Sequence, residues 1–473
     1  MSKDIVVPLL LNGVEVFTSD KLVYNVYSPF TENLILYKAQ GASLEDIDKV
    51  TESSFQAFQC WMQLSYEKRR DVLNKVAAAL EKEREYFFNM LLEMGVSPQF
   101  ANFNIETGIN IIKESAALTS TPIGSIPQSY GGSYSLVVRE PCGPVLSIVP
   151  WNAPIILCIR AIVSPLAAGC SVLLKTSEQS PMIHHELAKL FLKAGGPPGL
   201  VNTVHHSSED APNIITALVN SPRIKKINFT GSSNVGKIIS NLAAKVSKPI
   251  LLELGGKCAA IVTLTADIDR AATEILRGAW AHNGQICMST ERVFVENEIY
   301  DSFLEKLAKR ANKIAVDNAG IPQRSVLQAE KITALVKDAI ERGAKCFFGN
   351  TSRSGAYLLP IILTEVNETH QIFDVETFGP VLYVSKVADY KEAIEKVNSS
   401  EYGLSCAIWS KDTLTAIEIA RNIESGAVHI NGSTIHDEPT LPHGGQKGSG
   451  SGRFNGTWGI EEFQYVKTIT ISK

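Results

Sequence analysis

The chain has 473 residues, 45% of them hydrophobic and 20% charged, and is therefore long enough to bury two or three sizeable cores. Its 45 basic residues face 49 acidic ones, and the net charge of −4 gives no electrostatic support to a nucleic-acid or anionic-membrane partner. Eight cysteines without CxxC or regular spacing argue against a disulfide framework or a zinc ribbon. A reducing, cytoplasmic location is expected.

A membrane span is also not expected. The most apolar stretch, residues 153–174, approaches the length of a span, but Arg160 lies inside it and Pro165 interrupts it. An arginine at mid-span costs roughly 2.5–3.5 kcal/mol on insertion scales. We therefore predict a buried helix followed by a strand. The first residues, from Met1 to Pro8, lack the long apolar core of a secretory signal.

The first elements expected along the chain are a hairpin and then helices. Asn12-Gly13 between apolar residues is typical of a type I′ turn. Ser43 can cap a helix that keeps apolar residues at helical spacing up to Trp61. Ser65 can cap a longer helix that ends by Gly95.

From about residue 144 the pattern changes to short apolar strands that alternate with helices, which predicts βαβ units and parallel sheets. Two such runs, before and after residue 255, indicate two α/β domains. Strands of the first run are expected at 172–174, 200–204 and 227–229. Strands of the second run are expected at 259–262, 292–295, 381–384, 405–409 and 427–430.

Two β-rich segments, 134–139 and 463–471, lie outside both runs. An apolar strand at a chain end needs a partner, which can be a domain edge or another subunit. The glycine-rich segment 444–452 is expected to be a folded loop rather than a linker.

Cys287, in Gly284-Gln285-Ile286-Cys287, and Glu253, in Glu253-Leu254-Gly255-Gly256-Lys257, together indicate a nucleophile and its base. A thiol reacts only as the thiolate, and its ordinary pKa of about 8.5 leaves little of it ionised at neutral pH. Alone, a cysteine is more often an inert buried side chain, and a glutamate beside two glycines is usually a solvated turn residue. The interpretation therefore depends on the other motifs.

Two segments are candidates for holding a nucleotide. Strand 227–229 runs into Thr230-Gly231-Ser232 and a helical pattern, so that a phosphate can approach the helix N-terminus, although Gly-Ser turns are common. Lys175 and Glu178 follow another strand, at the sheet edge where open α/β folds bind nucleotides. A carboxylate there would accept ribose hydrogen bonds and repel a 2′-phosphate. A surface lysine and a helix-start glutamate explain the same residues equally well.

Two further motifs carry suitable polar groups. Asn152 follows Pro150-Trp151 at the end of an apolar strand, where its amide can face an oxyanion; an ordinary turn asparagine is the alternative. The segment from Glu376 to Pro380 places a carboxylate and the ring of Phe378 near a tight turn.

Taken together and in this order, these segments resemble the aldehyde dehydrogenase superfamily over essentially the whole chain. The most specific motifs are Phe229-Thr230-Gly231-Ser232 and the segments that contain Glu253, Cys287 and Glu376. The resemblance implies an α/β fold with a Rossmann-like NAD-binding domain, an α/β catalytic domain and a small β-rich oligomerisation element of a homodimer or homotetramer. Their expected bounds are 1–122 with 143–252, 253–442, and 123–142 with 456–473.

The resemblance also implies the reaction. Cys287 attacks the aldehyde carbon, and the Asn152 amide with the Cys287 backbone N–H binds the oxyanion of the thiohemiacetal. Hydride then passes to NAD and leaves a thioester, which water attacks with Glu253 as general base. Family members that pass their acyl group to coenzyme A commonly lack this base, so hydrolysis to the carboxylic acid is expected here.

By the same analogy, Lys175 and Glu178 hold the adenosine ribose, Ser232 lies by the pyrophosphate, and Glu376 with Phe378 positions the nicotinamide half. The other cofactor-binding residues expected are Trp151, Gly231 and Gly255. No metal is expected, because the histidine pairs 184–185 and 205–206 lack ligand spacing; they are predicted to lie on the surface.

Segments 151–160, 442–445 and 452–456 look like the salicylaldehyde and vanillin dehydrogenase branch, which implies an aromatic aldehyde substrate. His443 stands where phenylalanine is frequent; it can touch substrate, although a structural role is preferred. Phe100, Phe103 and Met288 are candidate walls of the substrate pocket, and core packing explains them equally well.

Three alternatives remain open: an aliphatic or semialdehyde dehydrogenase of the same mechanism, a thiol esterase that needs no NAD, and a non-catalytic binding protein on this fold.

Overall fold

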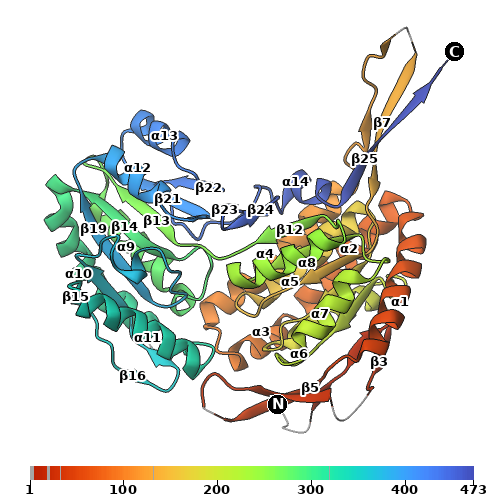
Figure 1. Ribbon diagram of the computed structural model, residues 1–473, viewed down its shortest axis with the longest axis horizontal. Coiled ribbons are helices and arrows are strands. Elements are labelled where there is room, and N and C mark those ends of the chain that lie inside the picture. The colour runs from red at the N-terminus through yellow and green to blue at the C-terminus, as the bar shows by residue number, and fades with distance from the viewer. Residues whose placement is uncertain (1–4, 19–21, 32, 131–132, 319, 473) are drawn as a thin grey trace.

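The computed structural model describes residues 5–18, 22–31, 33–130, 133–318 and 320–472, which form two α/β lobes and a projecting β arm (Figure 1). The α/β fold class is confirmed. The first four residues, which belong to the segment searched for a secretory signal, lie outside the described part of the chain.

The first lobe is built on an eight-stranded sheet with a parallel centre. Its strands, in spatial order, are β24 (Gly450–Ser451), β12 (Ile250–Glu253), β11 (Lys226–Thr230), β8 (Val145–Ile148), β9 (Val172–Lys175), β10 (Val201–Val204), β2 (Leu9–Leu11) and β3 (Val14–Val16). The strand order reverses at β8, which pairs with β9 on one side and β11 on the other. Open α/β sheets bind ligands outside the carboxyl ends of the strands at such a point.

Helices cover the first sheet, so its central strands are buried along their whole length. These helices are α1 (Leu44–Met62), α2 (Tyr66–Lys82), α3 (Arg84–Glu93), α4 (Pro98–Leu118), α5 (Pro154–Ala168), α6 (Pro181–Lys193), α7 (Ala211–Asn220), α8 (Ser233–Lys245) and α14 (Gly456–Glu461). Ser43 and Ser65 cap α1 and α2, as predicted. The single long helix expected after Ser65 is wrong, because the backbone leaves the helical region at Glu83, where no glycine or proline marks the break.

The second lobe contains a seven-stranded sheet that is parallel except for its edge strand β15. Its order is β15 (Lys345–Phe348), β18 (Ile361–Thr364), β19 (Val381–Val387), β14 (Thr290–Glu296), β13 (Cys258–Val262), β21 (Ser405–Trp409) and β22 (Ala427–Ile430). Its helices are α9 (Ile268–Trp280), α10 (Tyr300–Asn318), α11 (Val326–Glu341), α12 (Tyr390–Asn398) and α13 (Thr413–Arg421). The five strands expected in this run are therefore confirmed.

The two β-rich segments outside the lobes pair with each other. β25 (Gln464–Ile471) runs antiparallel to β7 (Tyr134–Pro141), and β6 (Gly124–Ser125) joins β7 on its other edge. This arm projects away from the first lobe (Figure 1). Smaller sheets join β1 (Val6–Val7), β5 (Ile35–Gln40) and β4 (Val23–Tyr27), β16 (Arg353–Ser354) and β17 (Tyr357–Leu358), and β20 (Tyr402–Gly403) and β23 (Gln446–Lys447).

Several local predictions are confirmed. Asn12 and Gly13 both have positive φ angles, as a type I′ turn requires. The glycine-rich segment 444–452 is folded, since it supplies β23 and β24, which run between the two lobes (Figure 1). The apolar stretch 153–174 forms helix α5 and strand β9, as predicted. Within the described residues, no helix is long and apolar enough to cross a membrane.

The prediction that the two histidine pairs lie on the surface is wrong, because all four are buried between α6, β10 and the N-terminal strands. His205 hydrogen-bonds Thr176 and the Pro8 carbonyl, and His184 accepts from the Ser177 N–H. Burial lowers the pKa of His184 to about 3, so its ring stays neutral. His185 lies 3.0 Å from a Glu15 carboxylate oxygen that also binds the ammonium of Lys189.

Trp61 links the first helix to the core, which gives a stability test. Its ring is fully buried and its Nε1 donates a 2.9 Å hydrogen bond to the Leu166 carbonyl of α5. We expect Trp61→Ala to lower the free energy of unfolding by roughly 3–5 kcal/mol, because it leaves a cavity where the ring was packed. Urea denaturation measures the loss. The half-exposed Trp458 is the control, and an equal loss in Trp458→Ala would contradict this assignment.

Candidate active site

A cavity of about 310 Å³ lies between the two lobes, at the carboxyl ends of strands of the first sheet. Nine of the eleven site residues expected from the sequence line it: Trp151, Asn152, Gly231, Ser232, Glu253, Gly255, Cys287, Glu376 and Phe378. They come from the carboxyl ends of β8, β11 and β12 in the first lobe and from loops of the second lobe. Residues far apart in the sequence thus meet at the switch point of the first sheet.

The loop before Cys287 has a strained backbone. After α9 the chain makes a short 3₁₀ turn in which His282, Asn283 and Gly284 all adopt left-handed φ angles of 50°, 54° and 73°. Non-glycine residues rarely take this conformation. A Cβ on Gly284 would lie 2.1 Å from the carbonyl oxygen of Gly379, so only glycine fits there. Hydrogen bonds from Asn283 to the Ile321 carbonyl and from Gln323 to the Asn283 carbonyl hold the turn.

The thiol of Cys287 faces the carboxylate of Glu253. Sγ of Cys287 lies 3.2 Å from Oε1 of Glu253, and Glu253 is the last residue of strand β12. Burial raises the pKa of the Cys287 thiol well above its usual range, and the negative charge of Glu253 raises it further. Without a substrate the thiol is therefore protonated, and its proton lies within reach of an adjacent base.

The carboxylate of Glu253 is itself almost fully buried. Burial raises its pKa, but the neighbouring His443, the positive charge of Arg160 and the hydrogen bond from Cys287 outweigh this, so its pKa lies below the ordinary value. Oε2 makes no hydrogen bond to described protein atoms. Glu253 is thus ionised and keeps one oxygen unused, as a general base requires.

Asn152 supplies a buried amide beside the thiol. Its Nδ2 donates a 3.0 Å hydrogen bond to the carbonyl of Gln285, which fixes the side chain against the Cys287 loop. Since an amide nitrogen has two hydrogens, the other remains available for an oxygen atom in the cavity. Gln285 is anchored in turn by its own amide, which donates to the His282 and Pro322 carbonyls.

A buried ion pair fixes the loop that contains Glu376. Lys257 pairs with Glu291 of β14 and donates a 2.9 Å hydrogen bond to Thr377. The carboxylate of Glu291 accepts the backbone N–H groups of Thr377 and Phe378. The ring of Phe378 then lies edge-on to Trp151, with centroids 6.0 Å apart.

The glycines after Glu253 allow close approach of three chain segments. A Cβ on Gly255 would lie 2.4 Å from Oε2 of Glu376, whose Oε1 accepts the Gly256 N–H at 3.0 Å. The segment from β24 closes the other side, because Ser449 donates its hydroxyl to the Gly255 carbonyl at 2.7 Å. Burial, with the charge of Glu291, raises the pKa of Glu376 to about 8.

The start of α8 provides a site of the right chemistry for a pyrophosphate. Ser232 caps the helix, accepting from the Val235 N–H, and it lies in the cavity beside Gly231. The free N–H groups and the dipole of the 13-residue helix favour an anion there. A Cβ on Gly231 would lie 2.6 Å from the ring of Phe229, so the small residue is required by packing.

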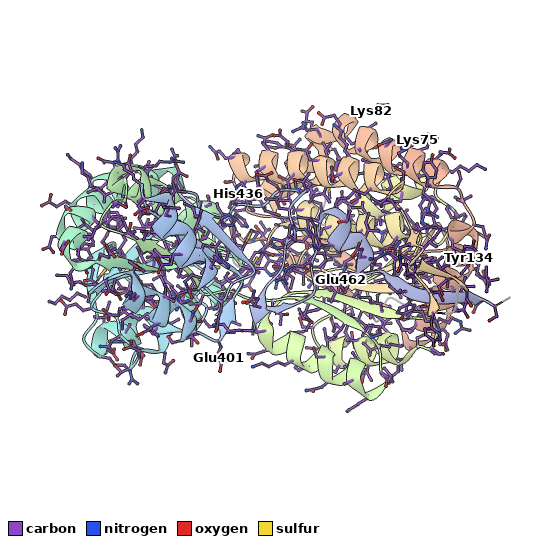
Figure 2. All side chains as sticks on the ribbon, turned by 90° about the horizontal axis from the view of Figure 1, so that it is seen from above. Lys75, Lys82, Tyr134, Glu401, His436 and Glu462 are labelled. Atoms are coloured by element: carbon purple, nitrogen blue, oxygen red, sulfur yellow. The ribbon has the colours of Figure 1, made fainter. Side chains whose placement is uncertain are left out.

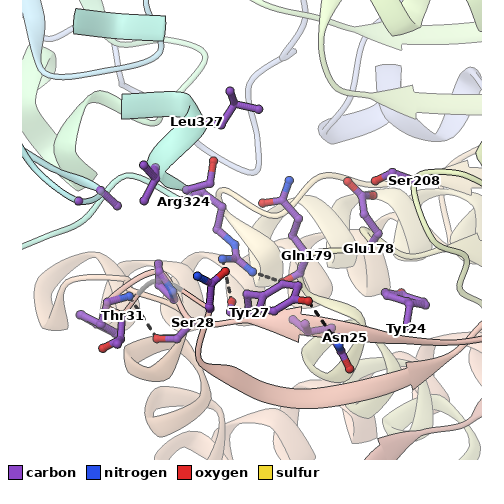
Figure 3. A pocket seen from close by; sticks show the side chains of 18 of the residues that line it. Tyr24, Asn25, Tyr27, Ser28, Thr31, Glu178, Gln179, Ser208, Arg324 and Leu327 are labelled. Carbon is purple, nitrogen blue, oxygen red and sulfur yellow. Dashed lines mark hydrogen bonds between the residues drawn. The ribbon is translucent and has the colours of Figure 1, made fainter. Parts of the chain in front are cut away.

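Lys175 and Glu178 do not line the same cavity but lie at the next strand end. Their charged groups are 3.5 Å apart, and the lysine is buried. Glu178 forms part of a larger cleft of about 910 Å³, on whose other wall Arg324 donates to the Tyr27 and Gln179 carbonyls (Figure 3). The carboxylate of Glu178 therefore faces open space, where it can accept ribose hydroxyl groups.

Two of the three candidate substrate-wall residues line one cavity. Phe100 and Phe103 stack on each other and line a cavity of about 770 Å³. Phe100 also stacks on His282 of the strained turn, with ring centroids 4.7 Å apart. Met288 is not among the residues that line this cavity.

Comparison with known proteins identifies the fold and the chemistry together. The family model described as "Aldehyde dehydrogenase family" matches residues 17–469. The chain belongs to the aldehyde dehydrogenase family. The resemblance read from its motifs is therefore confirmed, and an aldehyde is the class of substrate that this aldehyde dehydrogenase oxidises.

Three relatives show how close the similarity is. The chain is 38% identical to a vanillin dehydrogenase from Pseudomonas sp. (strain HR199 / DSM 7063), over 98% of each chain. It is similar to the crystal structure of a salicylaldehyde dehydrogenase from Pseudomonas putida G7 complexed with salicylaldehyde, with a TM-score of 0.96 and 36% identity over 99% of this chain and 98% of that one. An NAD-dependent aldehyde dehydrogenase from Sinorhizobium meliloti gives a TM-score of 0.94 at 30% identity, covering 99% and 95%.

Sequence reasoning missed several residues that shape the site of this aldehyde dehydrogenase. Lys257 stands in the motif around Glu253 but was given no role, and Glu291 of β14 was not singled out. Asp437 was also missed; it lies with His443 behind Glu253. No spacing rule brings residues 253, 437 and 443 together, so only the folded chain shows this group.

The raised pKa of Glu376 predicts a pH effect on stability. Its pKa rises from 4.5 in the unfolded chain to about 8 on folding. The contribution of this carboxyl to the free energy of unfolding is therefore complete below pH 4.5 and is lost as the pH rises toward 8. Glu376→Gln cannot ionise. We therefore expect its melting temperature, relative to wild type, to rise between pH 5 and pH 8.

Thermal melts of the coenzyme-free protein across this pH range measure the difference. Glu395→Gln, at an exposed position on α12, is the matched control. A Glu376→Gln difference that does not change with pH would contradict the buried, protonated carboxyl.

Proposed function

We propose that this protein is an NAD-dependent aldehyde dehydrogenase that oxidises a small aromatic aldehyde to its carboxylic acid. The observation that carries the proposal is the 3.2 Å contact between Cys287 Sγ and Glu253 Oε1, beside the amide of Asn152 in one cavity. A nucleophile, a base and an oxyanion donor are the three groups that acyl chemistry on a thiol needs.

The roles of these residues follow from their positions. Glu253 takes the thiol proton, and the sulfur of Cys287 forms a bond to the aldehyde carbon. The free hydrogen of the Asn152 amide and the Cys287 backbone N–H bind the resulting oxyanion. After hydride loss a thioester remains on Cys287. Glu253 then takes a proton from water, which attacks the thioester carbon and releases the acid and the thiol.

NAD, when bound, accepts the hydride. The residues present fit it: Ser232 and the start of α8 would meet the pyrophosphate, and Phe378, Trp151 and Glu376 would flank the nicotinamide end. Lys175 and Glu178 would hold the adenosine ribose, and the carboxylate of Glu178 would disfavour a 2′-phosphate. Burial lowers the pKa of Lys175, partly offset by Glu178, so the pair binds as a unit rather than as two free charges.

An aromatic substrate is supported by the stacked rings of Phe100, Phe103 and His282 at a cavity near the nucleophile loop. Flat aromatic rings stack in offset or edge-to-face arrangements on such surfaces. The vanillin and salicylaldehyde dehydrogenases to which the chain is similar support the same class. Aliphatic aldehydes and semialdehydes are the competing class.

The mechanism predicts different defects for the two central residues. Cys287→Ala removes the nucleophile and is expected to abolish NADH formation from every aldehyde. Glu253→Gln keeps the cavity shape but removes the base, so turnover is expected to fall by about 10²–10⁴-fold. The measurement is NADH absorbance with benzaldehyde-type, aliphatic and semialdehyde substrates, repeated with NADP.

Faster turnover of an aliphatic aldehyde than of all aromatic ones would refute the substrate class. Product formation without NAD in wild type would favour a thiol esterase, and inactivity of folded, NAD-bound protein with every aldehyde would favour a binding protein. Cys346→Ala, at an exposed cysteine of the same domain, controls for loss of a thiol.

The protein is further proposed to act in the cytoplasm as a homodimer or homotetramer, with the β arm as the oligomerisation element. Seven of the eight residues of β25 are exposed, including Val466, Ile469 and Ile471. An exposed apolar strand at the edge of a sheet is typical of a surface that another subunit contacts. The proposed domain bounds are 1–122 with 143–252 for NAD binding, 253–442 for catalysis, and 123–142 with 456–473 for assembly.

Charges placed on the arm are expected to prevent assembly. Ile469 and Ile471 share one face of β25, and Ile469→Glu with Ile471→Glu would bury two unpaired carboxylates in any arm-mediated interface. We expect the double variant to be monomeric by light scattering coupled to size exclusion. Leu414→Glu, at an exposed apolar position on α13, is the control. An unchanged mass in the double variant would place the interface elsewhere.

A further inference from the structure

The base Glu253 has a second ionisable neighbour besides Cys287. Nε2 of His443 lies 3.7 Å from Oε1 of Glu253, and Nδ1 of the same ring lies 3.7 Å from Oδ1 of Asp437. Arg160 of α5 pairs with the other oxygen of Asp437. These side chains form a continuous buried line behind the nucleophile, with His443 at its centre.

The line is held by the surrounding backbone. His443 exchanges two backbone hydrogen bonds with Phe454, at 3.0 and 2.7 Å. Asn455 donates to Oδ1 of Asp437 at 3.1 Å, and the Arg160 guanidinium lies 5.8 Å from the centre of the Phe454 ring. The imidazole is therefore fixed between two carboxylates rather than free to turn into solvent.

The far end of the line reaches open space. Asp437 lines the 770 Å³ cavity together with Phe100, His282 and His436, whereas Cys287 and Glu253 line the separate 310 Å³ cavity. His436, next to Asp437 in the chain, lies at the junction of the two lobes (Figure 2). A proton that reaches Asp437 can leave through water in the part of this cavity that a bound aromatic ring does not fill.

The reaction makes such an exit necessary. Glu253 takes one proton from the thiol of Cys287 and must lose it before it can take a second proton from water. Neither Cys287 nor Asn152 can accept that proton while the thioester exists. The only titratable side chain besides Cys287 that contacts Glu253 within the described residues is His443.

We propose that His443 and Asp437 form a proton relay. It removes the proton from the Glu253 carboxyl after the thioester forms and before it is hydrolysed. The O–H bond of Glu253 breaks as an N–H bond forms at Nε2 of His443, and the N–H bond at Nδ1 breaks as an O–H bond forms on Asp437. Water in the cavity then takes this proton. No electrons move and no co-reactant is needed. The inference rests on the proposed function.

The distances and neighbouring charges are compatible with this role. Separations of 3.7 Å exceed a hydrogen bond, but catalytic hydrogen bonds are often long without substrate and tighten in the complex. Burial raises the pKa of Asp437, but Arg160 and His443 outweigh this, so its pKa lies below the ordinary value and Asp437 passes the proton on to water instead of keeping it. His429 of β22 also faces this group, and burial lowers its pKa to about 4, so it stays neutral.

The test separates the two half-reactions. Rapid mixing of enzyme, NAD and an aromatic aldehyde gives an NADH burst from thioester formation, and the steady state then reports hydrolysis. We expect His443→Gln and Asp437→Asn to keep a burst of one NADH per site and to lose about 10²-fold in steady-state rate. Added imidazole is expected to restore part of the rate of His443→Ala. His370→Gln, at a buried histidine that contacts Asn367, is the control.

Each outcome decides between the claims. An unchanged steady-state rate and pH profile in His443→Gln, with active wild type, would overturn the relay alone. Loss of the burst together with turnover, in protein whose circular dichroism is normal, would also overturn it, because His443 would then serve the thiol or the substrate. If Asp437→Asn fails to fold, His443→Phe, which keeps a planar ring, provides the same comparison. Inactive wild type would overturn the proposed function and the relay with it.

Discussion

The geometry of the site depends on the buried ion pair between Lys257 and Glu291. Glu291 accepts the backbone N–H groups of Thr377 and Phe378, and Lys257 stands directly after the Gly255-Gly256 turn. The pair thus joins the segment that contains Glu253 to the loop that contains Glu376. Removing one partner of a buried pair leaves an uncompensated charge and typically costs 3–5 kcal/mol. Such an interaction is expensive to form but fixes one relative position of the two loops.

Strain is concentrated where the chemistry is proposed to occur. His282, Asn283 and Phe378 all have left-handed backbones; His282 and Asn283 precede Cys287 in its loop, and Phe378 lines the same cavity. Conformations of this kind cost of order 1–3 kcal/mol each and persist only when the surroundings fix them. Here Gln285 and Gln323 supply that support through hydrogen bonds to main-chain carbonyls.

Sequence reasoning predicted the regular parts of the fold well, because apolar strands and capped helices are encoded locally. It also singled out Cys287, Glu253 and Asn152, which the fold brings to one cavity, because each stands in a short motif at a strand end or turn. It failed for His184 and His205, whose burial depends on packing between α6 and the N-terminal strands, and for the break at Glu83. The contact between Glu253 and His443 joins residues far apart in sequence, and no local pattern encodes it.

Strand β24 has a consequence for the order in which the molecule is made. Glu253 is held on its outer side by Gly450, and Ser449 binds the next turn, so the carboxylate is positioned by residues close to the chain end. Domains generally fold from the N-terminus during synthesis. The thiol of Cys287 therefore leaves the ribosome long before the proposed base has a fixed orientation. A chain truncated before residue 449 would carry the cysteine without the segment that orients the proposed base, so the proposed hydrolysis would require this late segment.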